Sequence, residues 1–255
     1  MMKRILFATD LDNTLLFSHR HRQPGDRCAE LWNGAEQGFF TPETVDLLPQ
    51  AARQVRLLPI TTRSIAQYQR IRWPAGALPR EALTANGAVL LRGGEIDRDW
   101  YDQSWELVRA HQGALRALLE RVSAREDVTS ARIVENMYVY AACSDAAAAE
   151  RCAAAWAQDA PFQMEVSGRK VYWFPPGIDK GTALRRAVER FGPERVIAAG
   201  DSVIDVPMLR RADLAMIPDG TLLPALPAER TLVCQENVRF PDFVLRTVLA
   251  QAGPG

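Results

Sequence analysis

The sequence lacks the cysteine and histidine patterns that mark disulfide scaffolds and zinc sites. It has four cysteines and three histidines in 255 residues, with no CxxC pair and no histidine spacing to accompany one. We therefore expect reduced thiols that serve mainly in packing, which suits a cytoplasmic location. The cysteines are scattered along the chain, at Cys28, Cys143, Cys152 and Cys234.

Long apolar runs and an excess of one charge are also missing. The N-terminal apolar run is too short for a signal peptide, and no later run approaches the length of a membrane span. The 31 basic and 31 acidic residues cancel, so no overall field draws the chain to nucleic acid or anionic lipid. We expect a globular protein that has neither nucleic acid nor a membrane as its partner.

What is present is enough apolar sequence for one sizeable domain, or for a main domain with a smaller one. Hydrophobic residues make up 47% of the chain and charged residues 24%, which is ordinary for a globular protein. Short apolar runs alternate with amphipathic stretches, and this alternation predicts a parallel sheet covered by helices on both faces. The predicted strands are 5–9, 55–60, 196–199, 214–217 and 232–234, and the clearest helices are 42–54, with Thr41 as its N-cap, and 182–191.

The middle of the chain has a different pattern, in which turns separate apolar runs and helices. We expect helices at 104–122 and 145–158, a long strand at 132–142, and a hairpin over 162–174. This pattern indicates an α+β insert with an antiparallel sheet. The stretch Pro175-Pro176-Gly177 then marks the return to the first unit. The predicted domains are a core of residues 1–87 and 176–255 and an insert of residues 88–175.

One segment, residues 17–40, shows no periodicity and is predicted to be a structureless loop. A loop of this length in a compact domain is usually functional or disordered. Because it begins directly after a predicted strand with an acidic end, it can fold over that end. The alternative is a surface excursion held by Trp32, Phe39 and Phe40. The sequence leaves both interpretations open.

Polar side chains follow the predicted strands, or begin the predicted helices, at four places. In a parallel sheet the carboxyl ends of the strands share one edge, and ligands gather there. We therefore expect these four pieces to meet at one site. They are Asp10-Leu11-Asp12-Asn13-Thr14, Thr61-Thr62-Arg63-Ser64, Lys180 in GIDKGTAL, and Asp201 with Asp205 in GDSVIDVPML.

The aspartates of these pieces would repel one another if they met without a cation. Two carboxylates about 4 Å apart repel by several kcal/mol at an effective dielectric constant near 20, which raises their pKa values. Ligation by oxygen atoms with few protein ligands favours Mg²⁺, which keeps its waters and takes substrate phosphate. The pattern predicts a magnesium–phosphate site in which Thr61 and Lys180 bind the phosphate. The predicted metal-binding residues are Asp10, Asp12, Asp201 and Asp205.

Each piece also has a purely structural interpretation. The paired aspartates of the first piece can form an Asx turn, and those of the last can cap a helix over 203–211. Thr61 can cap a helix as well. Lys180 is harder to explain in this way, because a cation at a helix N-terminus opposes the helix dipole. The four pieces occur together in one consistent order, which favours a shared site.

The four pieces resemble the motifs of the haloacid dehalogenase (HAD) superfamily of phosphohydrolases. DLDNTLL is similar to the first motif, DxDxT, and TTRS to the second, in which a Ser or Thr ends a strand. Lys180 in DKGTAL resembles the third motif, and GDSVIDVPML the fourth, GDxxxD. The insert has the place of the C2-type cap, and TANGA at 84–88 precedes it as in Cof-like and sucrose-phosphatase-like members. The resemblance covers essentially the whole chain and implies a doubly wound, Rossmann-like α/β core with a smaller α+β C2 cap.

The resemblance implies a catalytic role for each motif. Asp10 would be the nucleophile that forms an aspartyl-phosphate. Asp12 would protonate the leaving oxygen and then deprotonate the attacking water. A carboxylic acid at Asp12 favours turnover over a stored phosphoenzyme, and it argues against a dehalogenase, whose halide leaving group needs no proton. Thr61 and Lys180 would bind the phosphoryl oxygens.

The resemblance also implies the ligands of the metal and the substrate. Mg²⁺ would be held by the Asp10 carboxylate, the Asp12 backbone carbonyl and Asp201, with Asp205 in support. Thr62 stands where this branch of the superfamily commonly has Gly, and residues 17–40 are longer than the resemblance leads us to expect. The predicted substrate-binding residues are Thr61, Thr62, Arg63, Asn86, Gly87 and Lys180.

The leading hypothesis is a Mg²⁺-dependent phosphatase of a small phosphorylated metabolite, with a sugar phosphate as one candidate. Because the insert is predicted to close over the site, we do not expect a large protein as the substrate. The alternatives are a phosphotransferase or mutase that uses the same intermediate, and a non-catalytic sensor that binds phosphate and Mg²⁺. Five cations of the insert either meet an anionic substrate or lie on solvated faces: Arg92, Arg98, Arg132, Arg169 and Lys170. The oligomeric state is not predicted.

Overall fold

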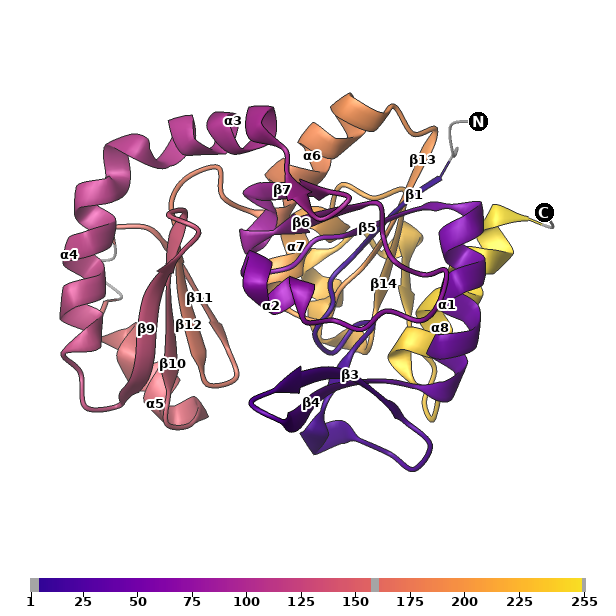
Figure 1. Cartoon of the computed structure of the whole chain (residues 1–255), viewed down its shortest axis with the longest axis horizontal. Coiled ribbons are helices and arrows are strands. Elements are labelled where there is room, and N and C mark those ends of the chain that lie inside the picture. The colour runs from indigo at the N-terminus through magenta and orange to yellow at the C-terminus, as the bar shows by residue number, and fades with distance from the viewer. Residues whose placement is uncertain (1–4, 157–160, 254–255) are drawn as a thin grey trace.

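The centre of the protein is a five-stranded parallel sheet, seen in the computed structural model that describes residues 5–156 and 161–253 (Figure 1). Its strands are β1 (Ile5–Thr9), β5 (Arg56–Pro59), β13 (Arg195–Ala199), β14 (Leu214–Ile217) and β15 (Thr231–Val233). They lie in the order β15-β14-β13-β1-β5. Thr9 is paired with Ala199, so β1 and β13 end level at the same edge of the sheet. All five predicted strands are confirmed.

Helices cover both faces of this sheet. They are α1 (Pro42–Gln54) and α8 (Phe240–Ala252) on one face, and α6 (Lys180–Phe191) and α7 (Val206–Leu209) on the other. Successive side chains of a strand point to opposite faces, so Phe7 packs in the α1–α8 layer while Leu6 and Ala8 pack in the α6–α7 layer. Thr41 caps α1 as predicted, because its Oγ1 accepts a hydrogen bond from the Thr44 N–H at 2.8 Å. The predicted doubly wound α/β core is confirmed.

A small antiparallel sheet adjoins the core next to β5. Its strands are β6 (Glu81–Thr84), β7 (Val89–Arg92) and β8 (Glu95–Ile96). A parallel bridge joins Ile60, just beyond β5, to Leu83 in β6. The short helix α2 (Ile65–Gln69) follows β5, and a 3-10 turn at Ala85–Gly87 joins β6 to β7.

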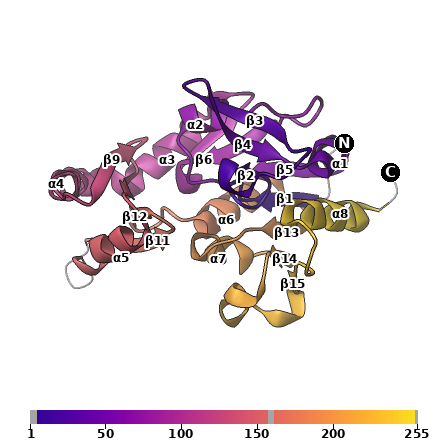
Figure 2. The ribbon, with the colours of Figure 1, turned by 90° about the horizontal axis from the view of Figure 1, so that it is seen from below.

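Beside the core lies a four-stranded antiparallel sheet with helices of its own (Figure 2). The elements of this unit are α3 (Arg98–Val108), α4 (Gln112–Ser123), β9 (Val128–Val134), β10 (Tyr138–Cys143), α5 (Ala146–Ala154), β11 (Gln163–Ser167) and β12 (Lys170–Phe174). The strand order is β11-β12-β10-β9. Leu118 of α4, Ala149 of α5 and Trp173 of β12 share one apolar cluster, so α4 and α5 cover one face of the sheet. The predicted antiparallel sheet is present, and the boundaries at 88 and 175 stay a prediction.

The helices of this unit depart from the prediction in one respect. The single helix expected at 104–122 is wrong, because α3 and α4 are separate helices joined by a 3-10 turn at Arg109–His111. The chain changes direction sharply there (Figure 1). The helix expected at 145–158 is observed as α5, with Asp145 as its N-cap. Positions 157 and 158 of that prediction lie outside the described residues.

The long strand expected at 132–142 is also wrong, because it is a hairpin of β9 and β10. Glu135 and Asn136 both have positive φ, and the Met137 N–H donates to the Val134 carbonyl at 2.8 Å. Two successive residues with positive φ are typical of a type I′ turn, for which Asn-Gly is the usual sequence, and Tyr138 is the first residue paired with Val134 after the turn. The Glu-Asn pair is not a typical turn sequence. The sequence therefore predicts one continuous strand where the structure has two.

Residues 17–40 form a folded sheet, so the prediction of a structureless loop is wrong. The three antiparallel strands lie in the order β2-β4-β3. They are β2 (Phe17–Ser18), β3 (Arg27–Trp32) and β4 (Ala35–Phe40). Phe39 and Phe40 are buried, whereas Trp32 is 52% exposed. The pairing of β3 with β4 shifts register twice, which breaks the alternation by which a strand is recognised. We call residues 17–40 the N-terminal sheet.

The remaining regular segments are short 3-10 turns. They are His19–His21, Val203–Asp205, Gly220–Ala225 and Ala228–Arg230. Within residues 5–156 and 161–253, no helix combines the length and the apolar character needed to cross a bilayer.

Candidate active site

The carboxylates of Asp10, Asp201 and Asp205 converge at the carboxyl end of the two central strands. Asp10 directly follows β1, and its N–H donates to the carbonyl of Ala199 in β13 at 2.9 Å. Asp201 and Asp205 belong to the loop that follows β13. One carboxylate oxygen from each aspartate lies within 4.8 Å of the other two. We call these three residues and Lys180 the acidic centre.

Lys180 supplies the positive charge of the acidic centre. It is the first residue of α6, and its Nζ donates to Asp10 Oδ1 and Asp205 Oδ1, at 2.5 Å each. The residue is only 1% exposed. Burial acts to lower the pKa of Lys180, but the Asp10 and Asp205 carboxylates raise it above its usual range. The two carboxylates also explain why a cation is stable at a helix N-terminus despite the helix dipole.

The acidic centre holds more negative charge than Lys180 neutralises. Burial raises the pKa of Asp10 well above its usual value; Lys180 opposes this effect, and Asp205 and Asp201 add to it. Burial and the neighbouring Asp205 raise the pKa of Asp201 to about 7. A bound cation would relieve this repulsion, and carboxylate oxygens are ligands that Mg²⁺ prefers. The donor set therefore fits a divalent cation.

The loop after β13 is folded around the Asp205 carboxylate. Asp205 Oδ2 accepts hydrogen bonds from the Asp201 N–H, the Ser202 N–H and the Ser202 hydroxyl, each at 3.0 Å. Gly200 allows this close approach, because a Cβ there would lie 2.4 Å from the Asp205 Cβ. Asp201 accepts one side-chain hydrogen bond, from Asn13 Nδ2 at 3.3 Å. Asp205 thus orients the loop, and Asp201 keeps the freer carboxylate.

Thr61 lies at the same edge, directly beyond Ile60. It is fully buried, and its N–H donates to the Leu83 carbonyl at 2.9 Å. Thr61 Oγ1 accepts from the Arg63 N–H at 3.2 Å. Within the part of the chain that the structure describes, the Thr61 hydroxyl donates to no protein acceptor. Its proton is therefore available to a ligand oxygen.

Asn86 and Gly87 hold α6 against the loop after β5. The Asn86 N–H donates to the Thr61 carbonyl at 2.8 Å, and Asn86 Nδ2 donates to the Ile178 carbonyl at 3.2 Å. Gly87 has a φ of +91°, and a Cβ there would lie 2.2 Å from the Ala183 Cβ of α6. Both residues therefore position the helix that begins at the buried lysine. Their predicted contact with substrate stays a prediction.

Asp12 is held in a two-pronged ion pair by Arg63. Arg63 Nε donates to Asp12 Oδ2 at 2.9 Å, and Nη2 donates to Oδ1 at 2.7 Å. Arg63 Nη1 donates to Glu30 Oε2 at 2.8 Å, and Arg70 Nε donates to Glu30 Oε1 at 2.8 Å. Burial acts to raise the pKa of Asp12, but Arg63 lowers it well below the usual value. We call Glu30, Arg63 and Asp12 the ion-pair chain.

Comparison with protein families assigns the chain to one of them. A family model described as haloacid dehalogenase-like hydrolase matches residues 6–213. The chain belongs to this family. The matched residues include the whole acidic centre, and the resemblance drawn from the four motifs is confirmed. No curated protein matches the sequence of this hydrolase.

Solved structures share the fold of this hydrolase at low sequence identity. The sucrose-phosphatase of Synechocystis sp. PCC6803, solved in complex with sucrose and phosphate, has a TM-score of 0.63 and 16% identity, with 98% of each chain covered. A trehalose-6-phosphate phosphatase related protein has a TM-score of 0.61 and 16% identity, with 97% of this chain and 96% of that chain covered. A haloacid dehalogenase-like hydrolase from B. subtilis has a TM-score of 0.57 and 16% identity, with coverage of 97% and 99%. These similarities establish a common fold.

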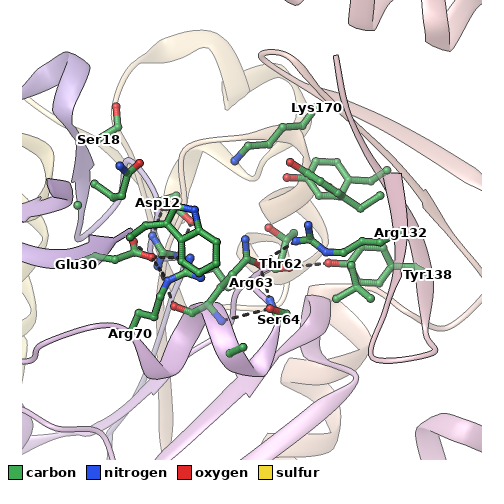
Figure 3. A pocket seen from close by; sticks show the side chains of 18 of the residues that line it. Asp12, Ser18, Glu30, Thr62, Arg63, Ser64, Arg70, Arg132, Tyr138 and Lys170 are labelled. Atoms are coloured by element: carbon green, nitrogen blue, oxygen red, sulfur yellow. Dashed lines mark hydrogen bonds and ion pairs between the residues drawn. The ribbon is translucent and has the colours of Figure 1, made fainter. Parts of the chain in front are cut away.

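A pocket of about 550 Å³ opens beside Asp12 in this hydrolase (Figure 3). It is bounded by the loops of the core, the N-terminal sheet and the four-stranded sheet. Tyr138 donates to the Thr62 carbonyl at 2.6 Å, and Glu135 Oε1 accepts from the Ile65 N–H at 2.9 Å, so the four-stranded sheet is docked on the core loop. The lining side chains that carry a charge or a ring are Asp12, Phe17, Glu30, Trp32, Arg63, Arg70, Arg132, Tyr138, Tyr140, Lys170 and Tyr172.

The structure brings the predicted motif residues together in two adjoining places. The acidic centre holds the predicted nucleophile and metal-binding side chains, while Asp12, Thr62 and Arg63 line the pocket. Of the five cations singled out in the insert, Arg132 and Lys170 line the pocket. The other three, Arg92, Arg98 and Arg169, are exposed and are not lining residues.

Sequence reasoning missed the contribution of the N-terminal sheet to the site. Glu30 is 3% exposed and pairs with both Arg63 and Arg70, yet it lies in a segment that shows no strand pattern. The one available signal is a carboxylate set between the apolar residues Ala29 and Leu31. A buried carboxylate needs a cationic partner, but the sequence alone does not name that partner.

Proposed function

We propose that this hydrolase is a Mg²⁺-dependent phosphatase of small phosphorylated metabolites. The observation that supports this function best is the convergence of the Asp10, Asp201 and Asp205 carboxylates, two of which, Asp10 and Asp205, bind the buried Lys180. A nucleophilic carboxylate beside a fixed cation and a divalent-metal site suits attack on phosphorus. Two structural neighbours are named as a sucrose-phosphatase and a trehalose-6-phosphate phosphatase related protein. Their names support a sugar phosphate as the substrate.

In this proposal the acidic centre holds the metal. The Asp10 carboxylate, the Asp12 backbone carbonyl and Asp201 would be ligands of Mg²⁺, and Asp205 would fix the loop that carries Asp201. When bound, Mg²⁺ neutralises negative charge on the phosphoryl oxygens.

Asp10 is the proposed nucleophile. One of its carboxylate oxygens forms a bond to phosphorus as the bond from phosphorus to the leaving oxygen breaks, which produces an aspartyl-phosphate. Lys180 and the Thr61 hydroxyl stabilise the phosphoryl oxygens. Water then attacks the phosphorus of the intermediate, which releases inorganic phosphate and restores the Asp10 carboxylate.

Asp12 is the proposed carrier of protons. It gives a proton to the leaving oxygen in the first step and takes one from the attacking water in the second. Its carboxylate is paired with Arg63 in this structure, so Asp12 must leave that pair to act as an acid. Glu30 keeps Arg63 paired when Asp12 moves, which avoids a half-buried arginine without a counter-ion.

We propose that residues 88–175 act as a C2-type cap over a core of residues 1–87 and 176–255. The contacts of Tyr138 with Thr62 and of Glu135 with Ile65 support this role. A cap docked in this way leaves room for a small molecule and excludes a folded protein. We also propose a cytoplasmic location, which is supported by the four cysteines, all free thiols.

The test is phosphate release from p-nitrophenyl phosphate with Mg²⁺ and with EDTA. We expect Mg²⁺-dependent release by the wild type and a fall in kcat of at least about a thousandfold in Asp10→Asn. Asp102→Asn is the matched control, because Asp102 is exposed on α3. Mass spectrometry of acid-quenched enzyme should find phosphate on Asp10.

Three outcomes would change the assignment. Equal rates for the wild type and Asp10→Asn would overturn the role of the nucleophile. Transfer to an added alcohol in preference to water would indicate a phosphotransferase. Binding of phosphate and Mg²⁺ with no turnover of any phosphomonoester would indicate a sensor.

A further inference from the structure

The pocket beside Asp12 carries two cations that its own carboxylates do not neutralise. Its acidic lining residues, Asp12 and Glu30, are both paired with arginines of the core. Within residues 5–156 and 161–253, neither Arg132 nor Lys170 forms an ion pair. The wall of the pocket that comes from the four-stranded sheet is therefore positively charged.

Lys170 is the first residue of β12 and is half-buried. Its amine end points into the pocket, across from Asp12 (Figure 3). An ammonium group is protonated at neutral pH, and one that lines a pocket without a paired carboxylate attracts an anionic ligand. The chain has only three lysines, and two of them, Lys170 and Lys180, lie at the site.

Arg132 projects from β9 and is fixed without a carboxylate. Its guanidinium carbon lies 4.7 Å from the centre of the Tyr140 ring, and Nη2 donates to Gln67 Oε1 at 3.2 Å. The guanidinium has five N–H donors in a planar fork that matches a carboxylate or a phosphate. The contact with Gln67 leaves most of these donors to a ligand.

We infer that Lys170 and Arg132 form a second anion subsite, and that the leaving group of the substrate carries a carboxylate or a second phosphate. This inference rests on the proposed phosphatase function. The transferred phosphoryl group already has its partners in Lys180, Thr61 and the metal ligands, which lie on the core. The cations of the opposite wall therefore face the part of the substrate that leaves. A volume of about 550 Å³ with tyrosine rings in its wall suits a small polar metabolite.

The test compares pairs of phosphate esters in which one member has an additional anionic group. Glucose 6-phosphate is paired with 6-phosphogluconate, and fructose 6-phosphate with fructose 1,6-bisphosphate. Each is measured as a competitive inhibitor of p-nitrophenyl phosphate hydrolysis, so the result does not depend on its own turnover. In at least one pair we expect the more anionic member to bind roughly tenfold more tightly. The pair that shows the preference tells whether the anion is a carboxylate or a phosphate.

Variants then locate the preference. The double variant Lys170→Met/Arg132→Gln should remove most of it. Arg169→Gln is the matched control, because Arg169 adjoins Lys170 in sequence but is exposed and is not a lining residue. Absence of a preference in both pairs, or a preference that survives in the double variant, would overturn the inference.

Failure of the proposed function gives a different result. In that case p-nitrophenyl phosphate is not hydrolysed, and calorimetry with the same four compounds tests the subsite by itself. Tighter binding of an anionic member to the wild type than to the double variant would then support the subsite without the reaction. Equal binding to the two proteins would refute it.

Discussion

Two lysines that lie ten residues apart in the chain have opposite surroundings at the two ends of this site. Lys180 in the acidic centre is buried and bonded to two carboxylates at 2.5 Å. Lys170 in the pocket wall is half-buried and forms no ion pair among the described residues. The core thus surrounds its lysine with an excess of carboxylates, whereas the lysine of the pocket wall has no carboxylate paired with it among the described residues.

The difference follows from solvation. A charge taken out of water needs compensation by a partner, so Lys180 at the start of α6 requires the aspartates that follow the strands. A charge that is only half-buried keeps part of its hydration and needs no such partner. An unpaired Lys170 should therefore lower the folding stability only slightly.

The largest predicted effect is a contrast between the two lysines in folding stability. Lys180→Met leaves the Asp10 and Asp205 carboxylates without their cation and should lower the free energy of unfolding by about 3–5 kcal/mol. Lys170→Met should change it by no more than about 0.5 kcal/mol. Urea denaturation of both variants without Mg²⁺ measures the contrast. Equal losses would show that the two lysines do not differ as the structure indicates.

A smaller effect is expected when a metal joins the acidic centre. Mg²⁺ at a hundred times its Kd should stabilise the chelator-treated protein by about 2.7 kcal/mol, which raises Tm by roughly 5–10 °C in a chain of this size. Asp201→Asn should lose most of this rise, because it removes the carboxylate of the acidic centre that is not hydrogen-bonded to Lys180. The exposed Asp219 provides the control, Asp219→Asn. The same rise in Asp201→Asn as in the wild type would place the metal elsewhere.

The smallest effect concerns Glu30, which connects the two regions through the ion-pair chain. Glu30→Gln weakens the second partner of Arg63, so Asp12 should leave that arginine less readily. We expect kcat to fall roughly tenfold for an alkyl phosphate, whose leaving oxygen needs a proton. For p-nitrophenyl phosphate, whose leaving group needs little acid assistance, kcat should fall much less.

The control for this variant comes from the same small sheet. Glu36→Gln removes an exposed carboxylate that pairs with Arg22. We expect this variant to leave kcat unchanged for both substrates. If Glu30→Gln lowers both rates equally, Glu30 supports the fold and does not position Asp12.

The parallel core could be predicted because its signals are local. The run at 5–9 is apolar and ends in Asp10, and Thr41 before Pro42 marks a helix start. The N-terminal sheet could not be predicted, because its strand pairing shifts register twice. In addition, Trp32 is exposed, whereas a large aromatic residue in a strand is expected to be buried. The turn at Glu135 and Asn136 was missed for a related reason, since Glu is rare where φ is positive.

The candidate site divides in the same way. Short motifs indicated Asp10, Asp201 and Lys180, because the proposed chemistry needs carboxylates at strand ends and a cation at the start of a neighbouring helix. The motifs do not predict the partners of Arg63. Its guanidinium binds Asp12 through Nη2 and Glu30 through Nη1. Such pairs join residues distant in sequence, and only their approach in space creates them.

By itself, the sequence determined the alternation of strands and helices, the order of the four motifs and the presence of an inserted antiparallel sheet. Apolar periodicity and residue type are local properties, so they can be recognised without coordinates. The tertiary structure alone decided which charges are paired, namely Lys180 with its aspartates, and which have no ion pair among the described residues, namely Lys170 and Arg132. Burial and distance set the energy of a charge, and both depend on segments that meet only when the chain has folded.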